Sequence, residues 1–150
     1  MRQLVLEREV AAGEAVELSG EEFYYRARVR RVRAGDEVVV MDAAGVRWTT
    51  VAESVEATSL RLRPFRAKAE PAPDDPQIAV YQAIPKGRRF DDAVRLLVQA
   101  GATRIVPLVS ERSLVEIDAA AGRLERWRRV AREAMQQSGS ERLVSVEPPV

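Results

Sequence analysis

The first half of the chain alternates short apolar runs with turn residues, a pattern that is typical of strands. Such runs occupy residues 37–41, 48–52 and 60–65, and Gly45 falls between the first two, where a turn is needed. The pattern therefore predicts three short strands. Strands at this spacing indicate a small β-barrel or a curled sheet.

A helix is predicted before these strands, from residue 20 to about residue 33. Ser19 and Glu22 have the spacing of a capping box, in which two side chains bond the free N–H groups at a helix start. Gly35 is expected to end the helix. The apolar face of the helix carries residues spaced at i, i+4 and i+7, which are Tyr25, Val29 and Val32.

The second half of the chain predicts a different architecture. Apolar runs at residues 77–84 and 103–109 are typical of buried strands, and the segment 90–100 between them has helical spacing. Gly101 supplies the stop that commonly follows a helix. Strand, helix and strand within about thirty residues form a βαβ unit, whose strands are parallel and whose crossover is right-handed.

One more helix and one short strand are predicted after this unit. Asp118 is expected to cap a long helix that runs to Gln137 and stops at Gly139. Residues 143–146 then form a third strand, so the parallel sheet has three strands at most. The apolar stripe of the helix, expected to be core, consists of Leu124, Trp127, Ala131 and Ala134. Its solvated face is expected to carry Arg126, Arg128, Arg129 and Arg132.

Three prolines within six residues separate the two halves, at positions 71, 73 and 76. Proline removes a backbone donor and fixes φ, so this stretch suits neither a helix nor a central strand. We predict a β-barrel domain over residues 1–68, a linker over 69–76 and an α/β domain over 77–150. The fold class is therefore α+β followed by α/β.

Composition narrows the chemistry that this chain can perform. None of its 150 residues is cysteine or histidine, which excludes disulfides, thiolate nucleophiles, imidazole acid–base catalysis and the usual zinc sites. No stretch approaches the ~20 apolar residues of a membrane span, and the amino terminus is too charged for a signal peptide. We expect a cytoplasmic protein that binds neither a metal nor a membrane. A net charge of +1 means that any nucleic-acid surface is a local patch.

The densest cationic segment lies on the predicted helix over 20–33, with five arginines in eight residues beside two tyrosines. The candidate RNA-binding residues here are Tyr25, Arg26, Arg28, Arg30, Arg31 and Arg33. Like charges at these spacings repel each other, and contact with a phosphate backbone would relieve that repulsion and release counterions. The other interpretation is a solvated helix face paired with nearby carboxylates.

Two polar loops follow the first two strands of the predicted parallel sheet, at the edge where open α/β sheets usually bind ligands. The first carries Lys86, Arg88 and Arg89 around a glycine, a composition that suits phosphate but lacks the spacing of the known nucleotide-binding loops. The second carries Glu111 and Arg112 between two serines, and such a pair can orient a base edge or stabilise developing charge. An exposed basic turn and a local ion pair are the simpler interpretations.

These loops belong to an ordered series of motifs that resembles the ribosomal RNA small subunit methyltransferase E family. The series consists of KGRRF at 86–90, QAGATRIVPLVSERS at 99–113 and LERWRRVAREAMQQSG at 124–139, with a weaker match at 29–36. Departures from the family pattern occur at Tyr25, Arg30, the segment 97–100 and Ser140. The resemblance covers nearly the whole chain.

The resemblance implies methylation of N3 of a uridine in 16S rRNA, with S-adenosylmethionine as the methyl donor. It also implies a PUA-like RNA-binding barrel over 1–68, followed by a SPOUT domain whose carboxy-terminal knot binds the cofactor and forms a homodimer. Residues 77–150 would be the first half of that domain. Glu111 and Arg112 would be catalytic residues that steady the uracil, which must be unpaired or flipped out to expose N3 on its Watson–Crick edge.

The family's glycine-rich cofactor loop, GPEGG, does not occur in the sequence. No cofactor-binding residue is therefore assigned within this chain, and S-adenosylmethionine is expected only in the complete protein. We expect the 150-residue chain by itself to be inactive. The alternative is a non-catalytic RNA-binding or assembly module, in which the barrel binds RNA and the α/β domain serves association.

Overall fold

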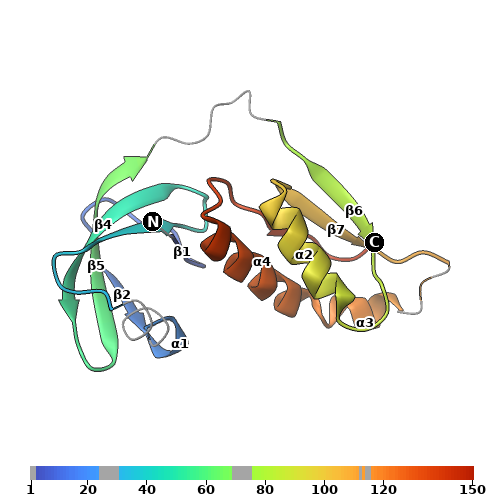
Figure 1. Cartoon of the computed structure of the whole chain (residues 1–150), viewed down its shortest axis with the longest axis horizontal. Coiled ribbons are helices and arrows are strands. Elements are labelled where there is room, and N and C mark those ends of the chain that lie inside the picture. The colour runs from blue at the N-terminus through green and yellow to red at the C-terminus, as the bar shows by residue number, and fades with distance from the viewer. Residues whose placement is uncertain (1–2, 24–30, 69–75, 112, 114–115) are drawn as a thin grey trace. The chain divides into compact units, whose positions relative to one another are not determined.

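The computed structural model describes residues 3–23, 31–68, 76–111, 113 and 116–150 (Figure 1). The chain forms two compact units, Met1–Glu70 and Pro71–Val150. The division falls within the segment where the prolines predict a linker, and residues 69–75 of that segment lie outside the described residues. Each unit has its own sheet and its own buried side chains.

The first unit is a five-stranded sheet in the order β1–β3–β4–β5–β2, which curls into a half-barrel (Figure 1). Its strands are β1 (Leu4–Val5), β2 (Val16–Ser19), β3 (Glu37–Met41), β4 (Arg47–Val55) and β5 (Ser59–Lys68). β1 pairs with β3 in parallel, and the other neighbours pair antiparallel. The three predicted strands are confirmed. Sequence reasoning misses β1 and β2, because strands of two and four residues are too short to show a clear alternation of apolar and polar residues.

One face of this sheet is buried, and the register of its strands explains why. Leu62 on β5 lies opposite Val16 on β2. Leu60 lies opposite Leu18 in the same pair of strands, two residues along, so all four side chains meet on one face. They join Val40 of β3 in the core of the unit. Two register shifts between β4 and β5 increase the local bend of the sheet.

A buried carboxylate fixes the turn between β3 and β4. Asp42 is 2% exposed, and its oxygens accept four hydrogen bonds of 2.9–3.3 Å. The donors are the backbone N–H groups of Val10, Ala44 and Val46 and the indole N–H of Trp48. Asp42 therefore ties this turn to the amino-terminal segment of the chain. Gly45 lies in the turn as predicted, with φ of 84°.

The helix predicted over 20–33 is wrong at its carboxyl end. Helix α1 spans Gly20–Phe23, and residues 31–33 are not helical. Residues 24–30 lie outside the described residues. Arg31 has φ of 53°, in the left-handed region that does not continue a right-handed helix.

A local turn leads into β3 where the helix was expected to end. The Arg33 N–H donates to the Asp36 carboxylate at 2.8 Å, and the Asp36 N–H donates to the Arg33 carbonyl at 3.0 Å. Aspartate side chains that bond nearby backbone compete with helix formation, and closely spaced arginines repel each other in a helix. Val32 still packs against the core of the unit, as the apolar spacing predicts.

The second unit is a three-stranded parallel sheet in the order β6–β7–β8, with α2 and α4 side by side against it (Figure 1). Its elements are β6 (Ala79–Ala83), α2 (Arg89–Gln99), β7 (Arg104–Leu108), α3 (Ile117–Ala121), α4 (Leu124–Ser138) and β8 (Ser145–Val146). The predicted parallel βαβ arrangement is confirmed, and so is the third short strand.

The long helix predicted from Asp118 to Gln137 is wrong, because two helices take its place. Helix α3 ends at Ala121 and α4 begins at Leu124. Gly122 stands at the break, and glycine inside a helix costs about 0.5–1 kcal/mol relative to alanine. The residue that precedes α3 is Glu116, so Asp118 lies inside the helix instead of capping it.

Packing between α2 and α4 forms the core of the second unit. The rings of Phe90 and Trp127 lie 4.6 Å apart at an angle of 58°. Three further side chains of the unit are no more than 1% exposed, namely Val94 on α2, Ala131 on α4 and Ile105 on β7. The apolar spacing in the sequence therefore identifies the buried faces of α2 and α4 correctly. The prediction that residues 77–84 form a buried strand is wrong, because β6 lies at the edge of the sheet and Tyr81 is 59% exposed. Within the described residues, no helix is long and apolar enough to cross a lipid bilayer.

The solvent-facing side of the half-barrel carries a cluster of charges between β4 and β5. Glu53 accepts hydrogen bonds from the Nε groups of Arg63 and Arg61, the latter at 3.2 Å. The hydrogen bond from Arg63, with a smaller contribution from Arg61, lowers the pKa of Glu53 below its ordinary value of 4.5. This cluster is exposed, so salt screens it.

Asp42→Ala should destabilise the first unit by about 3 kcal/mol, because it leaves buried N–H groups without an acceptor. Urea unfolding followed by the amide NMR signals of this unit measures the change. Asp36→Ala is the matched control, because the exposed Asp36 accepts one backbone bond and its removal should cost no more than about 1 kcal/mol. Equal destabilisation of the two variants would show that the Asp42 network does not anchor the unit.

Glu53→Gln should weaken the first unit at neutral pH and make no difference in acid. Because the pKa of Glu53 is lowered in the folded state, its stabilising effect is complete above its ordinary pKa of 4.5 and disappears as the pH falls through the lowered value. Unfolding of both proteins between pH 2 and pH 7 tests this. Glu56→Gln, in the connection between the same two strands, is the matched control that removes a carboxylate outside the cluster of Glu53, Arg61 and Arg63. A constant difference between wild type and Glu53→Gln would contradict the ion-pair explanation.

Candidate functional site

The two polar loops of the second unit leave the sheet at the same edge. Strands β6 and β7 run parallel with Ala83 opposite Leu108, and the Ile84 N–H donates to the Leu108 carbonyl at 3.1 Å. The loop over 85–88 and the turn over 110–113 therefore both begin at the carboxyl ends of their strands. This is the arrangement that the sequence predicts for the candidate ligand-binding edge.

The first loop presents three exposed cations. Lys86, Arg88 and Arg89 all face solvent, and Arg88 occupies the N-cap position of α2 with no side-chain cap. Gly87 has φ of 77°, a conformation that other residues rarely adopt. A Cβ atom at Gly87 would meet nothing within 4 Å among the described residues. Glycine is therefore favoured here by its backbone conformation and not by a lack of room for a side chain.

A pocket of about 280 Å³ opens beside this loop. It lies between the starts of α2 and α4, and its lining residues are Gly87, Arg88, Asp91, Arg123, Arg126 and Trp127. Asp91 is 6% exposed and pairs with the Arg126 guanidinium. Arg126 is therefore not simply part of a solvated helix face, as the sequence spacing predicts, because its partner on α2 draws it to the pocket.

Sequence reasoning misses Asp91 and Arg123 as residues of this pocket. A signal for Asp91 was present, because a carboxylate directly after Phe90 and one turn before Val94 lies beside the apolar face of α2 and needs a partner. Arg123 had no such signal. It becomes the N-cap residue of α4 only because the predicted long helix breaks after Ala121.

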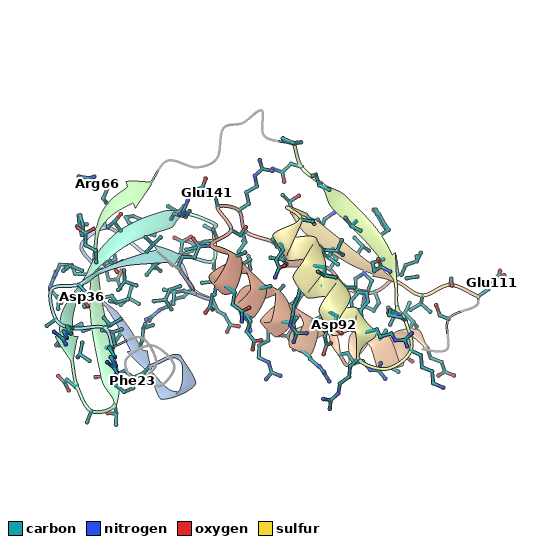
Figure 2. The ribbon with its side chains drawn as sticks, viewed as in Figure 1. Phe23, Asp36, Arg66, Asp92, Glu111 and Glu141 are labelled. Carbon is teal, nitrogen blue, oxygen red and sulfur yellow. The ribbon has the colours of Figure 1, made fainter. Side chains whose placement is uncertain are left out.

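The second loop is a turn held by serine hydroxyls. The Ser110 N–H donates to the Ser113 hydroxyl at 2.9 Å, and the two hydroxyls lie 3.2 Å apart. Glu111 is exposed on the turn, which projects beyond the carboxyl end of β7 and away from α2 (Figure 2). Arg112 lies outside the described residues, so the predicted pairing of Glu111 and Arg112 stays a prediction.

The remaining candidate residues belong to the first unit. Arg31 and Arg33 are exposed, on the turn that precedes β3. Those that lie outside the described residues are Tyr25, Arg26, Arg28 and Arg30. Their role in RNA binding stays a prediction.

The cationic surfaces that the structure describes suit an anionic partner more than a metal ion. Within the described part of the chain, no group of three or more acidic side chains is placed to hold a metal. Guanidinium groups supply paired donors that match phosphate oxygens. The site can therefore bind and orient phosphate, while acid–base steps fall to carboxylates and hydroxyls.

Comparison with protein families matches residues 73–150 to a family model described as an RNA methyltransferase domain. Among curated proteins, the chain is 34% identical over 140 residues to the ribosomal RNA small subunit methyltransferase E of Mycobacterium tuberculosis, covering 92% of this chain and 52% of that protein. It is 30% identical over 148 residues to the protein of the same name from Synechocystis, covering 99% of this chain and 48% of that protein. The chain thus spans about half the length of these relatives.

Comparison with solved structures also finds methyltransferases. A ribosomal RNA small subunit methyltransferase E from Neisseria gonorrhoeae, bound to S-adenosylmethionine, aligns with a TM-score of 0.83 and 27% identity, over 99% of this chain and 62% of that one. A putative methyltransferase from Legionella pneumophila, also with S-adenosylmethionine, aligns with a TM-score of 0.81 at 23% identity, over 100% of this chain and 64% of that one, and supports the fold alone. Because the family model matches more than half of its residues, this chain belongs to the RNA methyltransferase family and is similar to the ribosomal RNA small subunit methyltransferases E.

Proposed function

We propose that this chain supplies rRNA binding and part of the catalytic domain to an S-adenosylmethionine-dependent enzyme that methylates N3 of a uridine in 16S rRNA. The observation that carries the proposal is the family match over residues 73–150, which includes both loops at the edge of the parallel sheet. The bound S-adenosylmethionine in the Neisseria gonorrhoeae relative supports the choice of cofactor.

Within this proposal the two units have separate tasks. The half-barrel of the first unit corresponds to a PUA-like RNA-binding domain, and the second unit corresponds to the first half of a SPOUT domain that dimerises when complete. The alignment with the Neisseria gonorrhoeae structure over 99% of this chain supports this division. The 16S rRNA of the small ribosomal subunit is the proposed partner.

The chemistry requires an unpaired uracil, because N3 lies on the Watson–Crick edge of the base. N3 first loses its proton to water, which leaves negative charge on N3 and on the neighbouring carbonyl oxygens of the base. The methyl group of S-adenosylmethionine would then pass to N3 as its bond to sulfur breaks, with neutral S-adenosylhomocysteine as the leaving group. Arg112 offsets that charge by donating to a carbonyl oxygen, and Glu111, exposed on its turn, orients the base edge.

The cations hold the RNA in place while this occurs. Lys86, Arg88 and Arg89 contact phosphates next to the target nucleotide. Arg31 and Arg33, with their neighbours on the first unit, contact the RNA backbone elsewhere. Most of the rate acceleration follows from holding N3 in line with the methyl group.

The function itself is tested on the complete protein with small-subunit rRNA and labelled S-adenosylmethionine. We expect N3-methyluridine in the nucleoside digest, and no methyl transfer by the 150-residue chain alone. Arg112→Gln in the complete protein should lower kcat by roughly 100-fold without weakening cofactor binding, because it removes a donor to developing charge. A methyl group on another base, or full activity of Arg112→Gln, would overturn the corresponding part of the proposal.

Replacing Arg31 and Arg33 with glutamate should weaken binding of this chain to small-subunit rRNA fragments. The slope of log affinity against log salt should fall by roughly 0.7–0.9 for each phosphate that the variant no longer neutralises. The matched control replaces Arg95 and Arg129, two cations of the second unit outside the pocket, with glutamate. If both double variants bind with the same affinity and slope, the turn before β3 is not part of the RNA surface.

A further inference from the structure

Among the residues that line the pocket between the starts of α2 and α4, only Arg88 has a role in the chemistry above. Three of its six lining residues are arginines, and Asp91 is the one carboxylate among them. We propose that this pocket binds a single phosphate group of the RNA backbone, with Arg88 and Arg123 as its principal ligands. That the phosphate belongs to RNA rests on the proposed function. That the pocket binds an anion rests on its lining residues.

The charge balance of the pocket favours an anion. Asp91 pairs with Arg126, which leaves two cations in excess among the lining side chains. Among the described residues, neither Arg88 nor Arg123 forms an ion pair through its guanidinium. Two guanidinium groups without carboxylate partners at one pocket provide several N–H donors for the oxygens of one phosphate.

The backbone adds to this positive charge, because both long helices of the second unit begin at the pocket. Arg88 is the N-cap residue of α2 and Arg123 is the N-cap residue of α4, and neither provides a side-chain cap. A cation near a helix N-terminus is unfavourable, since the free N–H groups there already carry partial positive charge. The negative charge of a bound phosphate would offset the repulsion between each arginine and the N-terminus of its helix.

The pocket is held in shape by contacts that do not depend on a ligand. The Asp91–Arg126 pair joins the first turn of α2 to the first turn of α4. Directly beside it, Phe90 and Trp127 pack with their ring centres 4.6 Å apart, and both are buried. The N-cap residues Arg88 and Arg123 are thus positioned by rigid elements, so little ordering is needed when an anion binds.

Charge and burial distinguish a phosphate from a base. The pocket has a volume of about 280 Å³, which leaves room for a phosphate, and its lining carries two more cations than carboxylates. Trp127 is 2% exposed and therefore offers no open ring face on which a base could stack. Among the parts of an RNA strand, the phosphate is the group that meets both conditions.

Binding of a single-stranded oligouridine to the whole chain tests the proposal. The variants are Arg88→Gln and Arg123→Gln, both at exposed positions, and the matched control is Arg129→Gln on α4 outside the pocket. Each pocket variant should weaken binding about tenfold and lower the log–log salt slope by about 0.7, while the control keeps the wild-type slope. An oligouridine with uncharged methylphosphonate linkages should bind wild type and pocket variants equally.

Inorganic phosphate provides a second probe that does not need RNA. In wild type and in Arg129→Gln, a phosphate titration should shift the amide NMR signals of residues 87–91 and 123–127, and in the Arg88→Gln/Arg123→Gln double variant it should not. If the pocket variants bind oligouridine like wild type, the pocket is not an RNA subsite. If phosphate shifts these signals but oligouridine does not, the pocket takes a free anion and the inference about RNA is wrong.

These outcomes are separable from failure of the proposed function. Failure of the methyltransferase proposal would appear as the absence of N3-methyluridine with the complete protein. That result would leave the affinities of the pocket variants for oligouridine unchanged. Conversely, equal binding by all variants would overturn the pocket while the methyl-transfer assay still gave its product.

Discussion

The pairing of Asp91 with Arg126 is the interaction on which the candidate site of the second unit depends. A carboxylate that is 6% exposed must be compensated, and removing its partner would leave a buried charge. The pair fixes the first turn of α2 against the first turn of α4. Phe90 and Trp127 pack next to it, so one polar contact and one apolar contact together set where both helices begin. The positions of Arg88 and Arg123 follow from that.

Much of the fold can be predicted from the sequence because its periodicities are simple. The run at 37–41 forms β3 with the same bounds, and the spacing of Phe90, Val94 and Val98 identifies the buried face of α2. The failures occur where a local interaction overrides periodicity. Asp36 builds a turn in place of the last part of the first predicted helix, and Gly122 divides another. In both places the predicted helix is interrupted, at one by a short-range hydrogen bond of Asp36 and at the other by a single glycine.

The site is less predictable than the fold, because it depends on which residues tertiary structure brings together. The loop with Lys86 and Arg88 follows from strand order, since parallel strands place their carboxyl ends at one edge. The pocket beside it does not follow from strand order. It requires the break between α3 and α4, which makes Arg123 an N-cap residue, and the pair that draws Arg126 toward α2. Neither can be read from the spacing of apolar residues.

A net charge of +1 is compatible with a nucleic-acid partner because electrostatic interactions in salt solution are local. At about 0.15 M salt the Debye length is about 8 Å, so a phosphate responds to the cations it touches and hardly to the charge of the whole chain. Glu53 pairs with both Arg61 and Arg63 on the half-barrel, whereas Arg88 and Arg123 have no such partner among the described residues. For the proposed RNA partner, the expected contact sites are therefore those where cations lack carboxylate partners, and counting cations along the sequence does not locate them.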